Sequence, residues 1–150
     1  MKRVALFLLL PLAVACATVR VKSSGGASSP TAAILQFLDA AKRRDLAAMA
    51  QVWGTDAGSA SATMSRQELE RRELIMMQCL RHEKATLGVS GPGEAGRLKL
   101  PVQLTMGDRR ANPSFTVVRS SGARWFVENF EMDQLRDQGF CSLPSAPAKP

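Results

Sequence analysis

Apolar residues recur every three or four positions in the first half of this chain, which is the spacing of an amphipathic helix. Pro30 suits the first position of such a helix, and Ser29 before it suits the N-cap. A second short helix is expected to follow Asp45 and to end at Gly54. The apolar positions of the two predicted helices are Ile34, Phe37, Leu38 and Ala41, then Leu46, Met49, Ala50 and Trp53.

The middle of the chain predicts a loop and then a longer helix. Residues 54–63 show neither helical nor alternating spacing, so we expect a loop there. Ser65 and Glu68 have the spacing of a capping box at the start of a helix over residues 66–81. Because "ELIMMQCL" is apolar on more than one face, this helix is expected to be largely covered. Its apolar stripe is Leu69, Met76 and Leu80, with Ile75 and Cys79 beside it.

From Glu83 onward, apolar and polar residues alternate, which is the pattern of strands with one buried face. Strands are expected over residues 84–90, 97–106, 114–120 and 123–132. Two to three helices followed by a meander of about four strands predict an α+β fold, with the helices packed on one face of an antiparallel sheet. In the last strand, the alternation places Trp125, Val127 and Asn129 on one face and Phe126, Glu128 and Phe130 on the other.

Residues 1–15 have the pattern of a secretory signal peptide rather than that of a folded segment. A short positive stretch, residues 1–3, precedes an apolar stretch over residues 4–14, and the small residues before Cys16 suit a cleavage site. The apolar stretch is too short to cross a membrane as a helix, which needs about 20 residues. We therefore expect the signal peptide to be removed and the protein to be exported.

The residues before Cys16 resemble the lipobox of bacterial lipoprotein precursors, an apolar and small signature that ends in cysteine. Ala13 stands where that signature usually has leucine. The resemblance implies cleavage after Ala15 and a diacylglycerol on Cys16. The lipid would anchor the protein to an envelope membrane facing the periplasm, the outer membrane where the cell has one. Secretion without a lipid and an uncleaved anchor are the two alternatives that the sequence leaves open.

Composition divides the rest of the chain into a tether, one domain and a tail. Residues 16–29 begin with Cys16 and are mostly small, polar and rich in glycine, which is typical of a flexible tether. Residues 30–142 carry the predicted helices and strands, and a length of 150 residues leaves room for one domain. Residues 143–150 have the composition of a disordered tail.

The net charge of +7 comes from cations that are scattered along the chain. No run reaches the length of about five like charges that marks a nucleic-acid-binding arm, so we expect no nucleic-acid partner. The favoured interpretation is a solvated basic surface with weak attraction to anionic lipid.

Cys79 and Cys141 are the two cysteines left when Cys16 is assigned to the anchor. An even number of cysteines in an exported chain favours a disulfide between them. The alternative is two separate thiols, with Cys79 on an apolar helix face and Cys141 in the tail.

The order of elements, which opens with "AAILQFLDAAKRRDLAAMAQVWG" and closes with "FTVVRSSGARWFVENFEM", resembles the nuclear transport factor 2-like group. These proteins are cystatin-like α+β rolls and include small envelope lipoproteins of bacteria. The resemblance covers residues 30–133 and implies a curved sheet with a cone-shaped pocket between sheet and helices. The strand that usually precedes the last helix of this group is not visible, because residues 54–63 show no β pattern.

Some enzymes of this superfamily place an aspartate general base in the pocket, beside tyrosine or protonated aspartate as oxyanion donors. This chain has no tyrosine, and Asp39 and Glu128 are the only acids close enough to predicted apolar or aromatic positions to be candidate catalytic groups. The other acids are expected at caps or at the surface, including Glu70 and Glu73 among the arginines of the third helix. A solvated or ion-paired carboxylate is the simpler interpretation of both candidates.

His82 is the only histidine, and no second Cys–His pair accompanies Cys79 and His82, so no metal site is expected. No phosphate-binding loop or dinucleotide motif is present, and we expect no cofactor. Trp125 and Phe126 are neighbours in the last strand and so point to opposite faces. Either both rings belong to the core, or one of them lines an apolar pocket or a partner surface.

The sequence therefore favours a non-catalytic envelope lipoprotein domain that binds a small apolar ligand or a protein partner in an accessory role. The alternative is a small isomerase or dehydratase that uses Asp39 or Glu128 in its pocket. An acid buried in an open cavity beside a second polar group would favour the enzyme. Acids that are exposed or paired with arginine would count against it.

Overall fold

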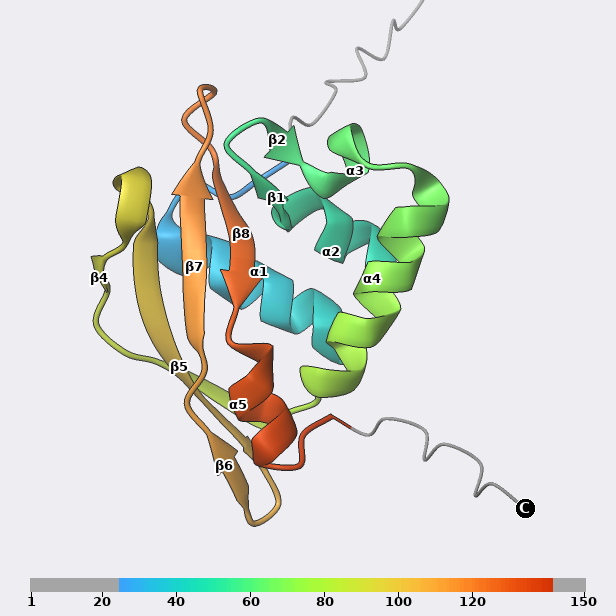
Figure 1. Ribbon diagram of the computed structural model, residues 1–150, viewed down its shortest axis with the longest axis vertical. Helices are drawn as coiled ribbons and strands as arrows, with labels where there is room; N and C mark the ends of the chain where they lie inside the picture. Colours follow the sequence, from blue (N-terminus) through green and yellow to red (C-terminus); the bar gives the residue numbers. More distant parts are fainter. Residues whose placement is uncertain (1–24, 142–150) are drawn as a thin grey trace, which may run out of the picture.

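The computed structural model describes residues 25–141, which form helices packed against an open antiparallel sheet (Figure 1). The predicted α+β class is confirmed. The predicted signal peptide, Cys16, the tether as far as residue 24 and the tail over residues 143–150 lie outside the described residues. Within residues 25–141, no helix is long and apolar enough to cross a membrane.

The main helices begin where capping side chains satisfy their free N–H groups. Ser29 accepts a hydrogen bond of 3.1 Å from the Ala32 N–H, and Asp45 and Ser65 cap the second and fourth helices in the same way. The three helix starts predicted from the sequence are therefore confirmed. The helices are α1 (Pro30–Arg43), α2 (Leu46–Val52), α3 (Ala60–Thr63), α4 (Arg66–Cys79) and α5 (Met132–Asp137), and η1 (Glu94–Gly96) is a short 3-10 turn.

The sheet is built from four main strands and two short ones (Figure 1). The strands are β3 (Lys84–Leu87), β4 (Gly91–Pro92), β5 (Leu98–Met106), β6 (Arg109–Ala111), β7 (Ser114–Arg119) and β8 (Trp125–Phe130). The main strands follow the order β3-β5-β7-β8, and β4 and β6 pair with β5. Where α1 crosses β7 and β8, the ring of Phe37 lies 6.4 Å from that of Phe115 and 6.2 Å from that of Phe130, between centroids. These rings form the centre of the core between the two layers.

The predicted alternation in the last strand is wrong beyond Val127, because β8 contains a bulge at Glu128. Val127 and Asn129 pair with consecutive residues of β7, so Glu128 between them has no partner in the ladder. The bulge turns Phe130 onto the same face as Val127, where it packs against α1. One extra residue thus moves a core aromatic ring to the side opposite to that expected.

Residues 54–63, predicted to be a loop, form a short hairpin and one helical turn. The strands β1 (Gly54–Thr55) and β2 (Gly58–Ser59) are antiparallel, and α3 follows directly. A parallel bridge between Trp53 and Val127 places this hairpin beside the edge of β8. Strands of two residues are too short to show alternation, so the pattern could not reveal them.

Residues 25–29, part of the predicted tether, pair with the sheet in the structure. Ala27 is fully buried and exchanges two backbone hydrogen bonds, of 2.8 and 2.9 Å, with Trp125. The guanidinium of Arg124 donates to the carbonyls of both glycines before Ala27. The folded region therefore begins before α1, at the point where the predicted tether meets it.

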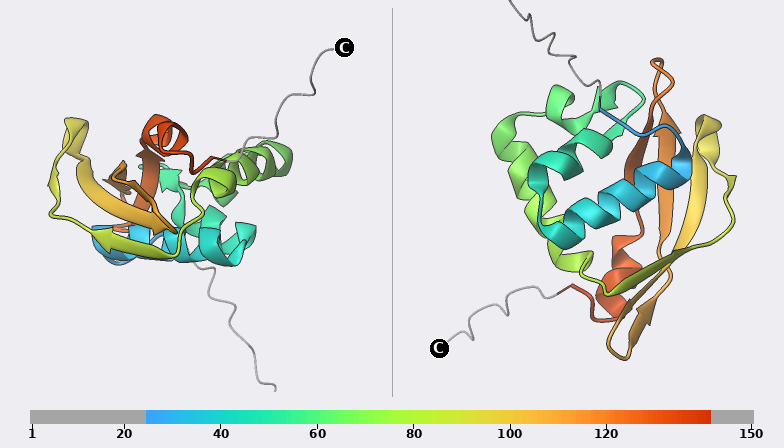
Figure 2. Two further views of the ribbon diagram at one scale, coloured as in Figure 1. Left: turned by 90° about the horizontal axis from the view of Figure 1, so that it is seen from below. Right: turned by 180° about the vertical axis from the view of Figure 1, so that it is seen from behind.

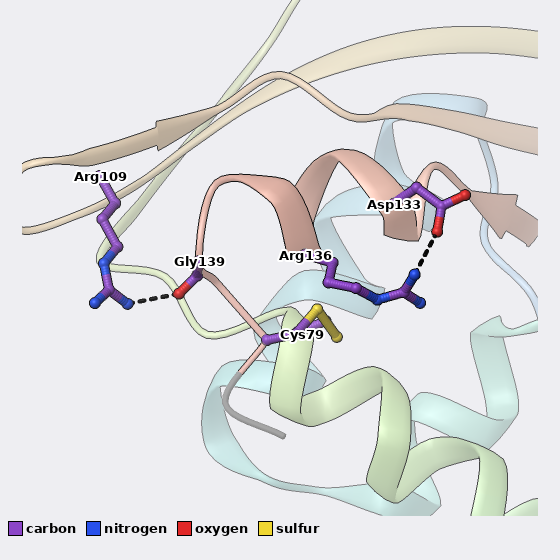
Figure 3. Close-up of a disulfide and its surroundings, with 6 residues drawn as sticks. Cys79, Arg109, Asp133, Arg136 and Gly139 are labelled. Atoms are coloured by element: carbon purple, nitrogen blue, oxygen red, sulfur yellow. Dashed lines mark hydrogen bonds and ion pairs between the residues drawn. A yellow bond between two sulfur atoms is a disulfide. The ribbon is translucent and has the colours of Figure 1, made fainter. Parts of the chain in front are cut away.

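The predicted disulfide between Cys79 and Cys141 is confirmed and joins the end of α4 to the segment after α5 (Figure 3). The two cysteines are 62 positions apart in the chain. Arg109 of β6 donates to the carbonyl of Gly139 at 2.5 Å and holds the same segment near the sheet (Figure 3). A disulfide is consistent with an oxidising, extracytoplasmic compartment.

Candidate functional site

The C-terminal ends of α1 and α4 come together near the end of β5 (Figures 1 and 2). The side chains at this place line a groove. Its volume is about 560 Å³, which is in the range of small-molecule sites. The groove combines an apolar wall with a rim of positively charged side chains.

The apolar wall is formed by Leu74 and Met77 of α4 together with Ala41 and Met106. Leu74 is 50% exposed, and Ile75 beside it is 45% exposed. The expectation that this helix is largely covered is therefore wrong. The neighbouring helices pack against one stripe of α4 and leave Leu74 uncovered, where it lines the groove.

The rim of the groove is cationic. Its basic side chains are those of Lys42, Arg44, Arg81 and His82. Among the described residues of the lining, Glu83 supplies the one carboxylate. The Lys42 ammonium donates a hydrogen bond of 2.8 Å to the backbone carbonyl of Glu83, which ties the end of α1 to the segment after α4. Nδ1 of His82 lies 2.7 Å from the carbonyl oxygen of Leu80, so the imidazole is also held at this edge.

Arg44 stands at the rim in a backbone conformation that arginine seldom adopts. Its φ of 59° and ψ of 34° lie in the left-handed region, which glycine usually supplies at a helix end. The backbone N–H of Arg44 caps α1 by donating to the carbonyls of Ala40 and Ala41. Within residues 25–141 its guanidinium makes no hydrogen bond or ion pair, whereas Arg43 beside it pairs with Asp39 at 3.1 Å.

The two candidate catalytic acids do not line this groove, and each pairs with an arginine. Asp39 is exposed on α1 and pairs with Arg43. Glu128, at the bulge of β8, forms a two-point ion pair with Arg97, in which Nη2 donates to Oε1 at 2.6 Å. This hydrogen bond and the charge of Glu128 raise the pKa of Arg97. The structure therefore does not bring the two acids together.

Glu128 also lines a smaller cavity, of about 370 Å³, between β8, α4 and α5. Its carboxylate is already engaged by Arg97, and Arg72 at the edge of the cavity pairs with a glutamate of its own helix. The apolar part of this cavity is formed by Trp53, Met76, Phe130 and Met132. Asn129 also lines the cavity, and its Oδ1 accepts a hydrogen bond from the Phe130 N–H, so the polar groups of the cavity are already engaged with the protein.

Trp125 and Phe126, the candidate binding residues, support the N-terminal segment. Phe126 is 1% exposed, and Gly26 lies directly against its ring. Trp125 is partly buried and pairs with Ala27. Neither side chain lines the groove between α1 and α4.

The expectation that Glu73 lies at the surface is wrong, since its side chain faces the core from α4 and is 1% exposed. Its Oε1 has no hydrogen-bond partner within residues 25–141. Burial, with a smaller contribution from the charge of Glu70, raises the pKa of Glu73 to about 7. The helical spacing of the sequence could have indicated this burial, because Glu73 falls between Leu69 and Met76 on the apolar stripe of the helix.

The described part of the chain holds no group of three or more His, Cys, Asp or Glu side chains placed to bind a metal ion. The groove instead offers apolar contact beside positive charge. Comparison of the chain with protein-family models, with curated proteins and with solved structures finds no match, so a proposal of function rests on the groove's own residues.

Proposed function

We propose that this chain is an exported, lipid-anchored and non-catalytic domain that binds a small apolar molecule in the groove between α1, α4 and β5. The observation that carries the proposal is the partly exposed apolar wall formed by Leu74, Met77 and Met106, in a cavity of about 560 Å³. Removing apolar surface from water is favourable by about 25 cal/mol per Å². A ligand with a matching apolar surface therefore gains affinity in this groove.

Three further observations support the location and the type of protein. The disulfide supports export, because such bonds persist in oxidising compartments. The lipobox-like residues before Cys16 support a lipid anchor and a position beside a membrane. The order of helices followed by an open antiparallel sheet supports the resemblance to the nuclear transport factor 2-like group.

The enzymatic alternative has less support. An isomerase or dehydratase of the expected type needs an acid that is free to exchange a proton with a bound substrate. Asp39 is exposed and paired with Arg43, and Glu128 is paired with Arg97. These ion pairs count against acid–base catalysis by Asp39 or by Glu128.

Two neighbouring residues allow a matched test. Leu74→Asp places a carboxylate in the apolar wall, whereas Ile75→Asp makes the same change on a side chain of similar exposure that does not line the groove. The mature protein is titrated with N-phenylnaphthylamine, an uncharged apolar dye whose fluorescence rises when it leaves water. We expect saturable binding by the native protein and by Ile75→Asp, and loss of binding in Leu74→Asp. Equal binding by both variants, or no saturable binding by the native protein, would contradict the proposal.

A further inference from the structure

The groove joins an apolar wall to a cationic rim, and this combination indicates the chemistry of its ligand. Some arginines elsewhere on the molecule pair with carboxylates, as Arg66 does with Glu70 at 2.8 Å, and others, such as Arg124, donate to backbone carbonyls. At the rim, Lys42 bonds to a backbone carbonyl, and Arg44 has no partner for its guanidinium among the described residues. Two positive charges therefore border the apolar wall, and neither forms an ion pair with a carboxylate of the described region, although Glu83 also lines the groove.

Arg44 occupies its place at the rim in spite of an unfavourable backbone conformation. Glycine would take the left-handed conformation at the end of α1 without strain. The neighbouring Arg43 already supplies a cation to the last turn of α1, so the end of the helix does not need a second one. A role for the Arg44 guanidinium at the groove explains why a strained arginine stands there.

The helix ends limit which anions the groove can hold. Both α1 and α4 end at the groove, so the partial negative charge of their C-termini faces it. This field opposes a small inorganic anion and offsets part of the attraction of Lys42 and Arg44. An anion that also buries an apolar chain gains the additional free energy of apolar contact.

We infer that the groove binds a single-chain amphiphile with an anionic head group, of the fatty-acid type. The head group lies at Lys42 and Arg44, and the alkyl chain lies along Leu74, Met77 and Met106. This inference rests on the proposed function, to which it adds the class of ligand and the sign of its charge.

Calorimetric titration of the mature protein tests the head-group preference. The probes are dodecanoate, dodecanol and inorganic phosphate, at low ionic strength and below the concentrations at which micelles form. We expect dodecanoate to bind about tenfold more tightly than dodecanol, because charge-assisted contacts add to the same apolar burial. Phosphate alone should not bind detectably, and added salt should reduce the advantage of dodecanoate.

Arg44→Gly and Arg43→Ala separate binding from a structural role. Arg44→Gly removes the charge and relaxes the left-handed backbone, so we expect a higher Tm together with a loss of about fivefold in dodecanoate affinity. Its affinity for dodecanol should not change. Arg43→Ala removes the adjacent cation outside the groove and should keep the dodecanoate affinity.

The outcomes distinguish this inference from the proposed function. Equal affinities for dodecanoate and dodecanol, or an unchanged dodecanoate affinity in Arg44→Gly, would overturn the inference and leave an apolar-ligand function standing. Tight binding of phosphate alone would replace the amphiphile with a simple anion. Absence of binding by both alkyl probes would overturn the inference and the proposed function together.

Discussion

Gly26 lies so close to the ring of Phe126 that a Cβ on the glycine would stand 2.7 Å from Phe126 Cζ. The glycine also has a φ of +71°, which L side chains seldom adopt. The segment before α1 can therefore pair with β8 because position 26 carries no side chain. This contact is where the predicted tether joins the fold.

Substitution of this glycine tests the importance of the docked segment. Gly26→Ala should lower the free energy of unfolding by about 1–3 kcal/mol, because it adds a steric clash to backbone strain. Gly96→Ala is the matched control, since Gly96 has a φ of +74° but nothing within 4 Å of the position of its Cβ. Urea unfolding measures both losses. Equal losses in the two variants would show that backbone strain alone matters and that the contact with Phe126 contributes little.

The buried carboxylate of Glu73 should make stability depend on pH. Its pKa in the folded chain is about 7, above the ordinary value of 4.5, so the unfolded state loses this proton first as the pH rises. The contribution of Glu73 to stability is therefore greatest below about pH 4.5 and falls by about 2–3 kcal/mol as the pH rises to about 7. Urea unfolding between these values measures the loss.

Glu73→Gln removes this titration while keeping the size of the side chain. We expect the variant to keep its stability between about pH 4.5 and pH 7, where the native protein loses some. In neutral solution the free energy of unfolding of the variant should therefore exceed that of the native protein. Glu70→Gln is the control, because Glu70 pairs with Arg66 at the surface of the same helix. This variant should still show most of the loss of stability between about pH 4.5 and pH 7. Parallel pH profiles for the native protein and Glu73→Gln would contradict the assignment to Glu73.

The disulfide should contribute to stability by constraining the unfolded chain. Replacing Cys79 and Cys141 together by serine should lower the free energy of unfolding by about 2–4 kcal/mol. Urea unfolding measures this loss, and reduction of the native protein should produce a loss of similar size. Peptide mass spectrometry after maleimide labelling of unreduced, denatured protein should find neither thiol labelled. Labelling of both cysteines would instead indicate two separate thiols.

The proposed lipid anchor on Cys16 predicts a defined mature N-terminus. Mass spectrometry of the protein from its native envelope should show residue 16 as the first residue, carrying a diacylglycerol. Cys16→Ser should release the protein from the membrane fraction, because serine lacks the thiol that would carry the diacylglycerol, and stable attachment depends on its acyl chains. An unmodified residue 16 would remove the anchor from the proposal and leave export in place.

The sequence alone determined the class of fold, because its signals act over short distances. Ser29, Asp45 and Ser65 cap helices through hydrogen bonds to residues three positions away, so the helix starts were visible in the sequence. Alternation located the four main strands for a similar reason. The disulfide followed from the number of cysteines in a chain predicted to be exported, rather than from geometry.

Only the tertiary structure decided the features that depend on which surfaces meet. The bulge at Glu128 reverses the face of Phe130, and nothing within the strand itself marks the extra residue. Glu73 is buried because other helices cover its stripe of α4, although its residue type favours the surface. The groove depends on the meeting of two helix ends that lie far apart in the chain, which places Lys42 and Arg44 beside Leu74. A local pattern does not encode such long-range contacts, because the folding of the whole chain selects them.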